Sequence, residues 1–164
     1  MEAHLGTEFQ HPNIVRFHDV GESNGLFYGV LDAVDGWTLK ELLQRVDKIP
    51  LSVCLDFGLQ ICSALSYLHG DGASTGVIHS DLKPSNILIA DQAEPGNNVR
   101  IVDFGIAKMN DAEPGANEQE GALTQVGTVV GSPLYMSPEQ VRGEIIDERS
   151  DAPYDKVWAT CDAD

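Results

Sequence analysis

Basic residues are scarce in this 164-residue sequence. Ten Lys and Arg stand against 26 Asp and Glu, which gives a formal net charge of -16. Binding to nucleic acid or to an anionic membrane surface needs basic patches, so neither kind of partner is expected. The acidity does not exclude nucleotide chemistry, because local cations and Mg²⁺ can hold ATP inside an acidic protein.

Cysteines and long apolar runs are also few. The three cysteines, Cys54, Cys62 and Cys161, form no C-x-x-C pair, so the sequence predicts neither a disulfide framework nor a zinc site. A reducing cytoplasm is the expected location. The first residues lack the pattern of a signal peptide, and no stretch approaches the roughly 18 apolar residues of a membrane span. The composition, 42% hydrophobic and 22% charged, is that of one soluble globular domain.

Short apolar runs predict two β-hairpins. Residues 14–17 and 26–31 are β-rich, and the Asn-Gly pair between them is a strong turn signal. Residues 87–89 and 99–102 form a second pair of apolar runs around a Pro-Gly-Asn-Asn turn. We therefore expect two small antiparallel β-hairpins.

Helical spacing of apolar residues lies between the two expected hairpins. Thr38 is placed to cap a short helix, and Pro50 precedes a longer helix that Gly70 ends. Residues 109–127 are rich in Gly, Asn, Gln and Glu with almost no apolar periodicity, so they are expected to form a mobile loop.

One segment carries the residue types that phosphoryl transfer needs. Residues 77–86 read V-I-H-S-D-L-K-P-S-N, and Asp-Phe-Gly follows at 103–105 after strand-like residues. A transferring phosphoryl group requires oxygen ligands for Mg²⁺, a cation near the γ-phosphate and a carboxylate that receives the nucleophile's proton. These residue types are supplied by Asp81, Lys83, Asn86 and Asp103.

Each of these residues also has an ordinary structural explanation. Asp81 alone fits a turn, Asn86 an Asx-turn, and residues 103–105 a strand end followed by a glycine turn. Taken singly, these explanations are the better ones. Taken together and in this order, the residues resemble the protein kinase motifs H-R-D-L-x-x-x-N and D-F-G, an agreement that chance seldom produces.

The resemblance implies a role for each residue of the segment. Asp81 would be the catalytic base, and Lys83 a second catalytic residue that also contacts ATP. Asn86 and Asp103 would bind Mg²⁺ and, through it, the nucleotide. ATP and Mg²⁺ are therefore the implied cofactors, and the backbone of Asp32 and Ala33, together with Val34, resembles the hinge that binds adenine, with Leu31 as the gatekeeper.

Flanking segments extend the resemblance. Residues 131–139, G-S-P-L-Y-M-S-P-E, resemble the end of an activation segment, with Ser137 in place of the alanine of A-P-E. Residues 11–15, H-P-N-I-V, resemble the loop that leads out of helix αC, and Asp151 resembles the aspartate that braces the catalytic loop. The D-L-K-P-S-N wording and Ser132 are similar to serine/threonine kinases, of the bacterial eukaryotic-type kind, rather than tyrosine kinases.

The resemblance implies an α+β, protein-kinase-like fold with part of the upper lobe, namely a β-hairpin and the end of helix αC, and a truncated, mainly helical lower lobe. Residues 1–151 would form a partial kinase domain, and 152–164 an unmatched tail that is expected to be disordered. No G-x-G-x-x-G occurs in the sequence, and neither the β3 lysine nor the helices after the activation segment are matched. The chain alone is therefore expected to transfer little phosphate.

Three positions depart from the family pattern. Ser80 stands where most members have the arginine that holds the activation-loop phosphate, although Thr124 and Thr128 remain candidate phosphosites. Gly6 replaces an apolar residue of αC. Glu139 lacks its usual arginine partner, so it should be solvated, paired with another group or protonated.

The function implied by the family is transfer of the ATP γ-phosphoryl group to Ser or Thr hydroxyls of a protein substrate. The alternative is a truncated, non-catalytic kinase remnant or a pseudokinase-like interaction module, which Ser80 and the unmatched ends favour. Small-molecule phosphotransferases are a third class. They are disfavoured by the Ser-Pro-Glu segment at 137–139, which in the family serves peptide substrates. No nucleic acid and no membrane span are expected.

Overall fold

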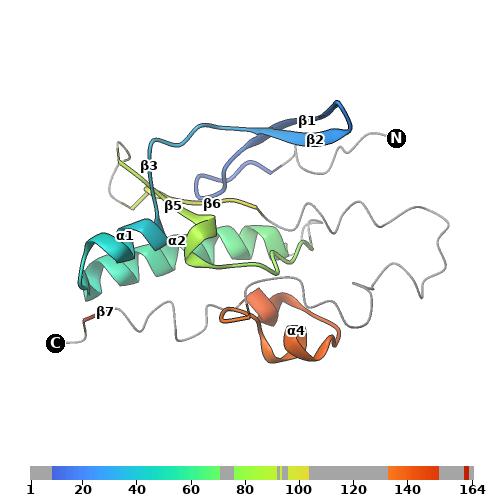
Figure 1. Ribbon diagram of the computed structural model, residues 1–164. Helices are drawn as coiled ribbons and strands as arrows, with labels where there is room; N and C mark the ends of the chain where they lie inside the picture. Colours follow the sequence, from blue (N-terminus) through green and yellow to red (C-terminus); the bar gives the residue numbers. More distant parts are fainter. Residues whose placement is uncertain are drawn as a thin grey trace.

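The computed structural model describes residues 9–70, 76–91, 93, 96–103, 133–151 and 161–162, with the backbone only for residues 27, 161 and 162. Figure 1 shows three levels: a hairpin on top, a small sheet beneath it, and two helices below that sheet. The elements in chain order are β1 Phe17–Ser23, β2 Leu26–Leu31, β3 Gly36–Thr38, α1 Leu39–Arg45, β4 Ile49–Pro50, α2 Leu51–His69, the 3₁₀ turn η1 Pro84–Asn86, β5 Ile87–Ala90, β6 Val99–Ile101, α4 Pro138–Arg142, the 3₁₀ turn η2 Glu148–Asp151 and β7 Cys161–Asp162.

The upper hairpin consists of β1 and β2, which pair antiparallel from Phe17 opposite Leu31 to Ser23 opposite Leu26. Asn24 and Gly25 join the strands, and both have positive φ, 53° and 77°. Positive φ at both central residues is the requirement of a type I′ turn, whose twist matches that of the strands. The predicted hairpin is confirmed, although its first strand begins at Phe17 rather than at residue 14.

The middle sheet contains β3, β5 and β6 in the order β3-β5-β6, with both pairs antiparallel. Its β5–β6 hairpin was predicted from the sequence. The third strand, β3, was not, because its three residues show no recognisable alternation. Close packing fixes its start: a Cβ added to Gly36 would lie 2.0 Å from the carbonyl oxygen of Ile89.

Helices α1 and α2 begin and end where the sequence predicts. Thr38 caps α1 by accepting a hydrogen bond from the Glu41 amide, and the Glu41 carboxylate accepts from the Thr38 amide in return, which is a reciprocal capping box. Gly70, with φ 76°, ends α2 in the left-handed conformation that glycine adopts most readily.

The core lies between α2 and the middle sheet. The apolar residues of α2 at helical spacing contact Ile87, Val99 and Ile101, which are at most 1% exposed. Ile14 joins this core from the N-terminal segment and pairs with Ile101 as an isolated parallel bridge. The catalytic-loop segment is therefore flanked by the end of α2 on one side and the start of β5 on the other.

Helix α2 is long and apolar enough to cross a membrane by length and composition alone, with a mean hydropathy of 1.5 in its most apolar window. The sequence reading had found no such stretch. Core helices of soluble proteins pass the same test, and α2 carries the buried Gln60, which hydrogen-bonds to Asn13, Asp56 and Asn98. We therefore interpret α2 as a core helix.

Two of the cysteines differ in state. Cys54 is disulfide-bonded, which the sequence did not predict, because the spacing of the three cysteines gave no pairing signal. Cys62 is a free, exposed thiol.

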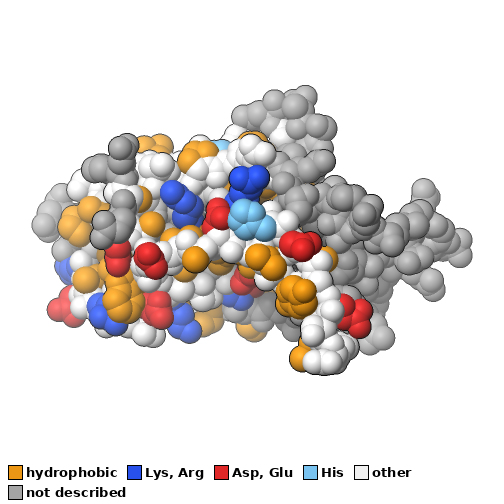
Figure 2. All heavy atoms as spheres, turned by 90° about the horizontal axis from the view of Figure 1, so that it is seen from above, with side chains coloured by type: hydrophobic (Ala, Val, Ile, Leu, Met, Phe, Trp, Pro, Cys, Tyr) orange, Lys and Arg blue, Asp and Glu red, His pale blue; other side chains and the backbone are white. Residues whose placement is uncertain are grey.

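Figure 2 shows the face of the molecule seen from above, on which acidic, basic and hydrophobic side chains are interspersed. On the described part of this face, no broad area of one charge sign is visible.

Candidate active site

The candidate site is built on a loop without regular secondary structure. Residues 76–83 lie between the end of α2 and the short turn η1, and the Val77 amide donates to the Leu68 carbonyl at 2.9 Å. The loop therefore begins against the last turn of α2 and leads through η1 into β5, the central strand of the middle sheet. Its geometry depends on side chains that reach it from elsewhere in the chain.

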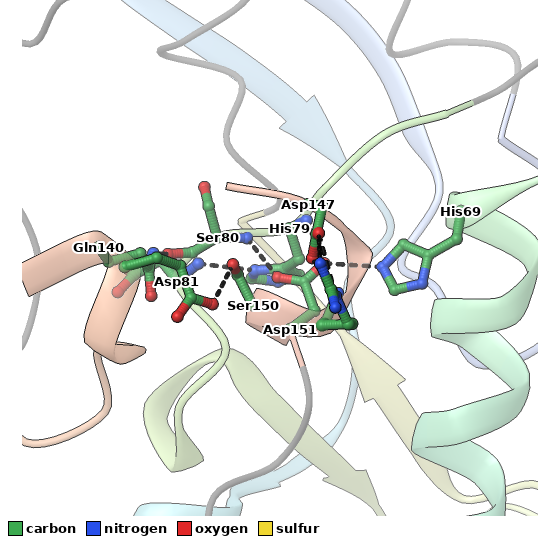
Figure 3. Close-up of polar contacts among 10 residues, drawn as sticks. His69, His79, Ser80, Asp81, Gln140, Asp147, Ser150 and Asp151 are labelled. Atoms are coloured by element: carbon green, nitrogen blue, oxygen red, sulfur yellow. Dashed lines mark hydrogen bonds and ion pairs between the residues drawn. The ribbon is translucent and has the colours of Figure 1, made fainter. Parts of the chain in front are cut away.

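Asp151 is the principal anchor of this loop. Its carboxylate is 2% exposed and accepts hydrogen bonds from the amides of His79 and Ser80, each at 2.6 Å. The Nε2 atom of His69, at the end of α2, lies 2.9 Å from the same carboxylate (Figure 3). Hydrogen bonds to an ionised acceptor are the strong ones, so Asp151 fixes two consecutive peptide groups of the loop. This is the bracing role that the family resemblance implied.

His79 is fully buried. The amide of Asp81 donates to its Nδ1 at 3.3 Å, and its Nε2 lies 3.1 Å from the carbonyl oxygen of Val102. Because an amide can only donate and a carbonyl can only accept, the ring is a neutral tautomer protonated on Nε2. Burial lowers the pKa of His79, against an opposing attraction from Asp151.

The side chains of Asp81, Lys83 and Asn86 meet in one cluster. Lys83 Nζ donates to Asp81 Oδ2 at 2.5 Å, and Asn86 Nδ2 donates to the carbonyl oxygen of Asp81 at 3.1 Å. The same amide nitrogen lies 3.3 Å from Asp81 Oδ2. The Asn86 amide nitrogen is therefore directed at Asp81, and Asn86 Oδ1 accepts a long hydrogen bond from Ser85 Oγ at 3.4 Å.

Asp103 follows the strand that adjoins this cluster. The amide of Val102 donates to the Asn86 carbonyl at 3.0 Å, so the backbone places Asp103 one residue from a direct contact with Asn86. Asp103 is exposed and has a positive φ of 58°, which is uncommon for a residue other than glycine. Phe104 and Gly105, the rest of the predicted motif, lie outside the described residues.

The donor set suits magnesium. Mg²⁺ prefers oxygen ligands and keeps several waters, so it needs only one or two protein ligands beside phosphate. An amide oxygen from Asn86 and a carboxylate from Asp103 meet that requirement. In the described ranges, no group of three His, Cys, Asp or Glu could hold a metal ion by itself.

The predicted hinge residues lie at the end of the upper hairpin. The Asp32 amide donates to the Arg16 carbonyl at 3.0 Å, and the Asp32 carboxylate lies 2.6 Å from His18 Nε2. Leu31, Asp32 and Ala33 are exposed. No direct contact joins them to Asp81 or Asp103 among the interactions of the described side chains, so their role in binding adenine stays a prediction.

Helix α4 lies beside the catalytic loop. Ser137 caps it within a capping box, and Glu139 in its first turn accepts a hydrogen bond from Ser150 Oγ at 2.5 Å. This hydrogen bond and one to its own backbone lower the pKa of Glu139. Of the three outcomes expected for this carboxylate, the structure shows pairing with another group, and the lowered pKa keeps the carboxylate ionised at neutral pH.

Two contacts that support the loop were not predicted from the sequence. Gln140 donates from Nε2 to the Ser80 carbonyl at 2.5 Å, and His69 contacts Asp151. A Ser-x-x-Gln capping-box signature at residues 137–140 was readable in the sequence. The partner of Gln140 was not, because 60 residues separate it from Ser80.

Comparisons with known proteins agree on one family. The family profile described as "Protein kinase domain" matches residues 1–159. The chain is 38% identical over 151 residues to serine/threonine-protein kinase pkn3 of Myxococcus xanthus, covering 92% of this chain and 26% of that protein. It is 34% identical over 150 residues to serine/threonine-protein kinase PrkC of Bacillus subtilis, covering 92% of this chain and 21% of that protein.

A solved structure shows the same fold. The kinase domain of PknI from Mycobacterium tuberculosis aligns with a TM-score of 0.63 and 25% identity, covering 90% of this chain and 48% of the PknI chain. The chain thus spans about half of a solved kinase domain and about a quarter or less of the full-length relatives. The expected α+β fold is confirmed, and the chain belongs to the protein kinase family, among the bacterial serine/threonine protein kinases.

Proposed function

We propose that this chain contributes the catalytic loop of an enzyme that transfers the γ-phosphoryl group of Mg-ATP to Ser or Thr hydroxyls of a protein substrate. The observation that carries the proposal is the cluster in which Lys83 and Asn86 both donate to Asp81. A carboxylate in direct contact with a cation and with the side-chain amide of an asparagine supplies the parts that phosphoryl transfer requires.

Asp81 is the residue that accepts the proton of the attacking hydroxyl. The Lys83 ammonium group donates to this carboxylate and offers positive charge to the γ-phosphate. Asn86, whose amide nitrogen is held by Asp81, would offer its Oδ1 to Mg²⁺, and the exposed carboxylate of Asp103 would be the second ligand. When bound, Mg²⁺ neutralises charge on the phosphates and orients them.

The hinge assignment belongs to the same proposal. The Asp32 amide already donates within the protein, to Arg16, so adenine recognition at this residue would use the Asp32 carbonyl as acceptor and the Ala33 amide as donor. Protein substrates are proposed because residues 137–139 correspond to the segment that serves peptides in the family. A cytoplasmic location is proposed by analogy with related catalytic domains, although the disulfide at Cys54 is uncommon in a reducing compartment.

A non-catalytic kinase module is the alternative, and Ser80 is the observation that favours it. A serine cannot make the bidentate contact through which arginine holds a phosphate. The catalytic proposal therefore includes the expectation that phosphorylation of the activation segment does not control this site.

Phosphotransfer distinguishes the two functions. The assay compares the parent chain with two variants, Asp81→Asn and the control Asp147→Asn. Each protein is incubated with Mg²⁺, γ-labelled ATP and a generic basic protein, and the label transferred to Ser and Thr is measured. The catalytic proposal predicts slow labelling that Asp81→Asn abolishes and Asp147→Asn leaves unchanged, because Asp147 contacts only Arg149 among the described side chains. Labelling that survives in Asp81→Asn contradicts the role of Asp81, and no labelling above background favours the non-catalytic module.

A further inference from the structure

Gln140 uses both ends of its side-chain amide. Its Oε1 accepts from the Ser137 amide at 2.8 Å, which closes the capping box of α4, and its Nε2 donates to the Ser80 carbonyl at 2.5 Å. The orientation of the amide follows from chemistry alone, because the Ser137 amide can only donate and the Ser80 carbonyl can only accept. One side chain therefore links the first turn of α4 to the catalytic loop (Figure 3).

The Ser80 carbonyl belongs to the peptide group that immediately precedes Asp81. The other end of that peptide group, the Asp81 amide, donates to His79 Nδ1 at 3.3 Å. The two preceding peptide groups are held by Asp151 through the amides of His79 and Ser80. Three consecutive peptide groups leading into Asp81 are thus fixed by side chains, and Gln140 supplies the contact to the last carbonyl.

The backbone at Ser80 needs such support. Its φ is 60°, in the left-handed region that costs a residue with a Cβ atom more than glycine. A conformation of this kind persists when surrounding hydrogen bonds hold it. Because Gln140 binds the carbonyl and not the side chain, its contact does not depend on which residue occupies position 80.

We propose that Gln140 is a positioning residue that orients the Ser80–Asp81 peptide group and couples the α4 segment to the catalytic base. The coupling requires no phosphate, which distinguishes it from the arginine-mediated link that Ser80 cannot form. Its consequence for catalysis rests on the proposed kinase function, whereas its effect on loop geometry does not.

Gln140→Glu separates the two tasks of this side chain. A glutamate still accepts from the Ser137 amide and keeps the capping box, since Glu and Gln serve equally there. Its second oxygen would face the Ser80 carbonyl and replace a hydrogen bond by repulsion. Gln140→Ala removes both contacts. Gln44→Glu, at an exposed position of α1, is the control for the added negative charge.

The measurement is amide hydrogen exchange of the chain, resolved by NMR. We expect residues 79–81 to exchange about tenfold faster in Gln140→Glu than in Gln44→Glu, the effect of losing roughly one hydrogen bond, with protection in α4 unchanged. Gln140→Ala should raise exchange in both places. Equal exchange of residues 79–81 in Gln140→Glu and Gln44→Glu, or loss of α4 protection alone, would overturn the proposal.

Two further readings keep the test decisive. If Gln140→Glu does not fold, the contact can be tested in the parent chain. Its Gln140 side-chain amide protons should exchange slowly, and rapid exchange of these protons would contradict the contact. In the phosphotransfer assay, kcat should fall about tenfold in Gln140→Glu with the KM for ATP unchanged. If the parent transfers no phosphate, the proposed function fails while hydrogen exchange still decides the role of Gln140.

Discussion

The catalytic loop and the upper hairpin hold their shapes by opposite means. Every residue of β2 pairs with β1, with one register shift between Phe17 and Asp19. Four large apolar residues of the hairpin are nevertheless 38% to 73% exposed: Val20, Leu26, Tyr28 and Val30. The loop at 76–83 has no regular structure, yet its backbone is bound by side chains 60 to 72 residues away. The hairpin is thus held by a backbone ladder, and the loop by hydrogen bonds from distant side chains.

The difference indicates where precision is needed. The hairpin can rely on its own ladder, since local pairing and a type I′ turn define its shape. A base and metal ligands must be held to within a fraction of an ångström, which regular structure does not provide for a loop. Buried, charge-assisted contacts from distant residues supply that support here.

The largest loss of stability is expected when Asp151 is replaced. Asp151→Ala removes the carboxylate that accepts from the buried His79 amide and the part-buried Ser80 amide, at a cost of about 1–3 kcal/mol for each of the two hydrogen bonds. The free energy of unfolding, from urea titration, should fall by the sum of these two costs. The control Asp147→Ala, at an exposed carboxylate, should change it far less. An equal effect of the two substitutions would show that the loop is not held by Asp151.

The second-largest effect is expected from acidification, which should lower the stability of the folded chain. The pKa of His79 is lowered below 6.5 by burial, so the unfolded state binds a proton more readily than the folded state. Stability is therefore fully present above pH 6.5 and falls as the pH drops below it, by at most about 1.4 kcal/mol per pH unit. Protonation would also set an N–H of the ring against the Asp81 amide.

Denaturation midpoints measured between pH 8 and pH 5 test this expectation. The variant His79→Gln, which carries no titrating group at this position, should show a flatter profile than the parent. Parallel profiles for the two proteins would contradict the assignment of His79 as a neutral, buried acceptor.

The smallest effect is expected in the hairpin. Gly25 has φ 77° with open space around it, so Gly25→Ala strains the turn by about 1 kcal/mol without a clash. Hydrogen exchange should accelerate in β1 and β2, while exchange in residues 77–86 stays as in the parent. Faster exchange in both regions would mean that the hairpin and the loop form one cooperative unit. Glu22→Ala, on the same hairpin but outside the turn's central pair, is the matched control.

Local signals in the sequence predicted most of this fold. The Asn-Gly turn, the Thr38 cap and the Gly70 end each act within a few residues, so the elements they define could be placed correctly. Strand β3 could not, because its three residues pair only in the presence of β5. The disulfide at Cys54 was also missed, because the cysteine spacing gives no pairing signal, whereas the apolar character of α2 is readable from the composition of Leu51–His69.

The site divides in the same way. Family motifs identified Asp81, Lys83, Asn86, Asp103 and Asp151, and the structure brings the first three into direct contact. Gln140 and Ser150 were missed, because their roles depend on distances across the fold. A capping-box pattern reveals that Gln140 supports its own helix, but no periodicity indicates that its other end reaches the Ser80 carbonyl.

We propose above that Asn86 in η1 and Asp103 after β6, both beside the supported loop, bind the metal of a bound nucleotide. Titration of the chain with a fluorescent ATP analogue, in Mg²⁺ and in EDTA, tests it most directly. Binding should require Mg²⁺ and be lost in Asp103→Ala, while the control Asp147→Ala binds as the parent does. Equal binding in EDTA, or unchanged binding by Asp103→Ala, would contradict the claim.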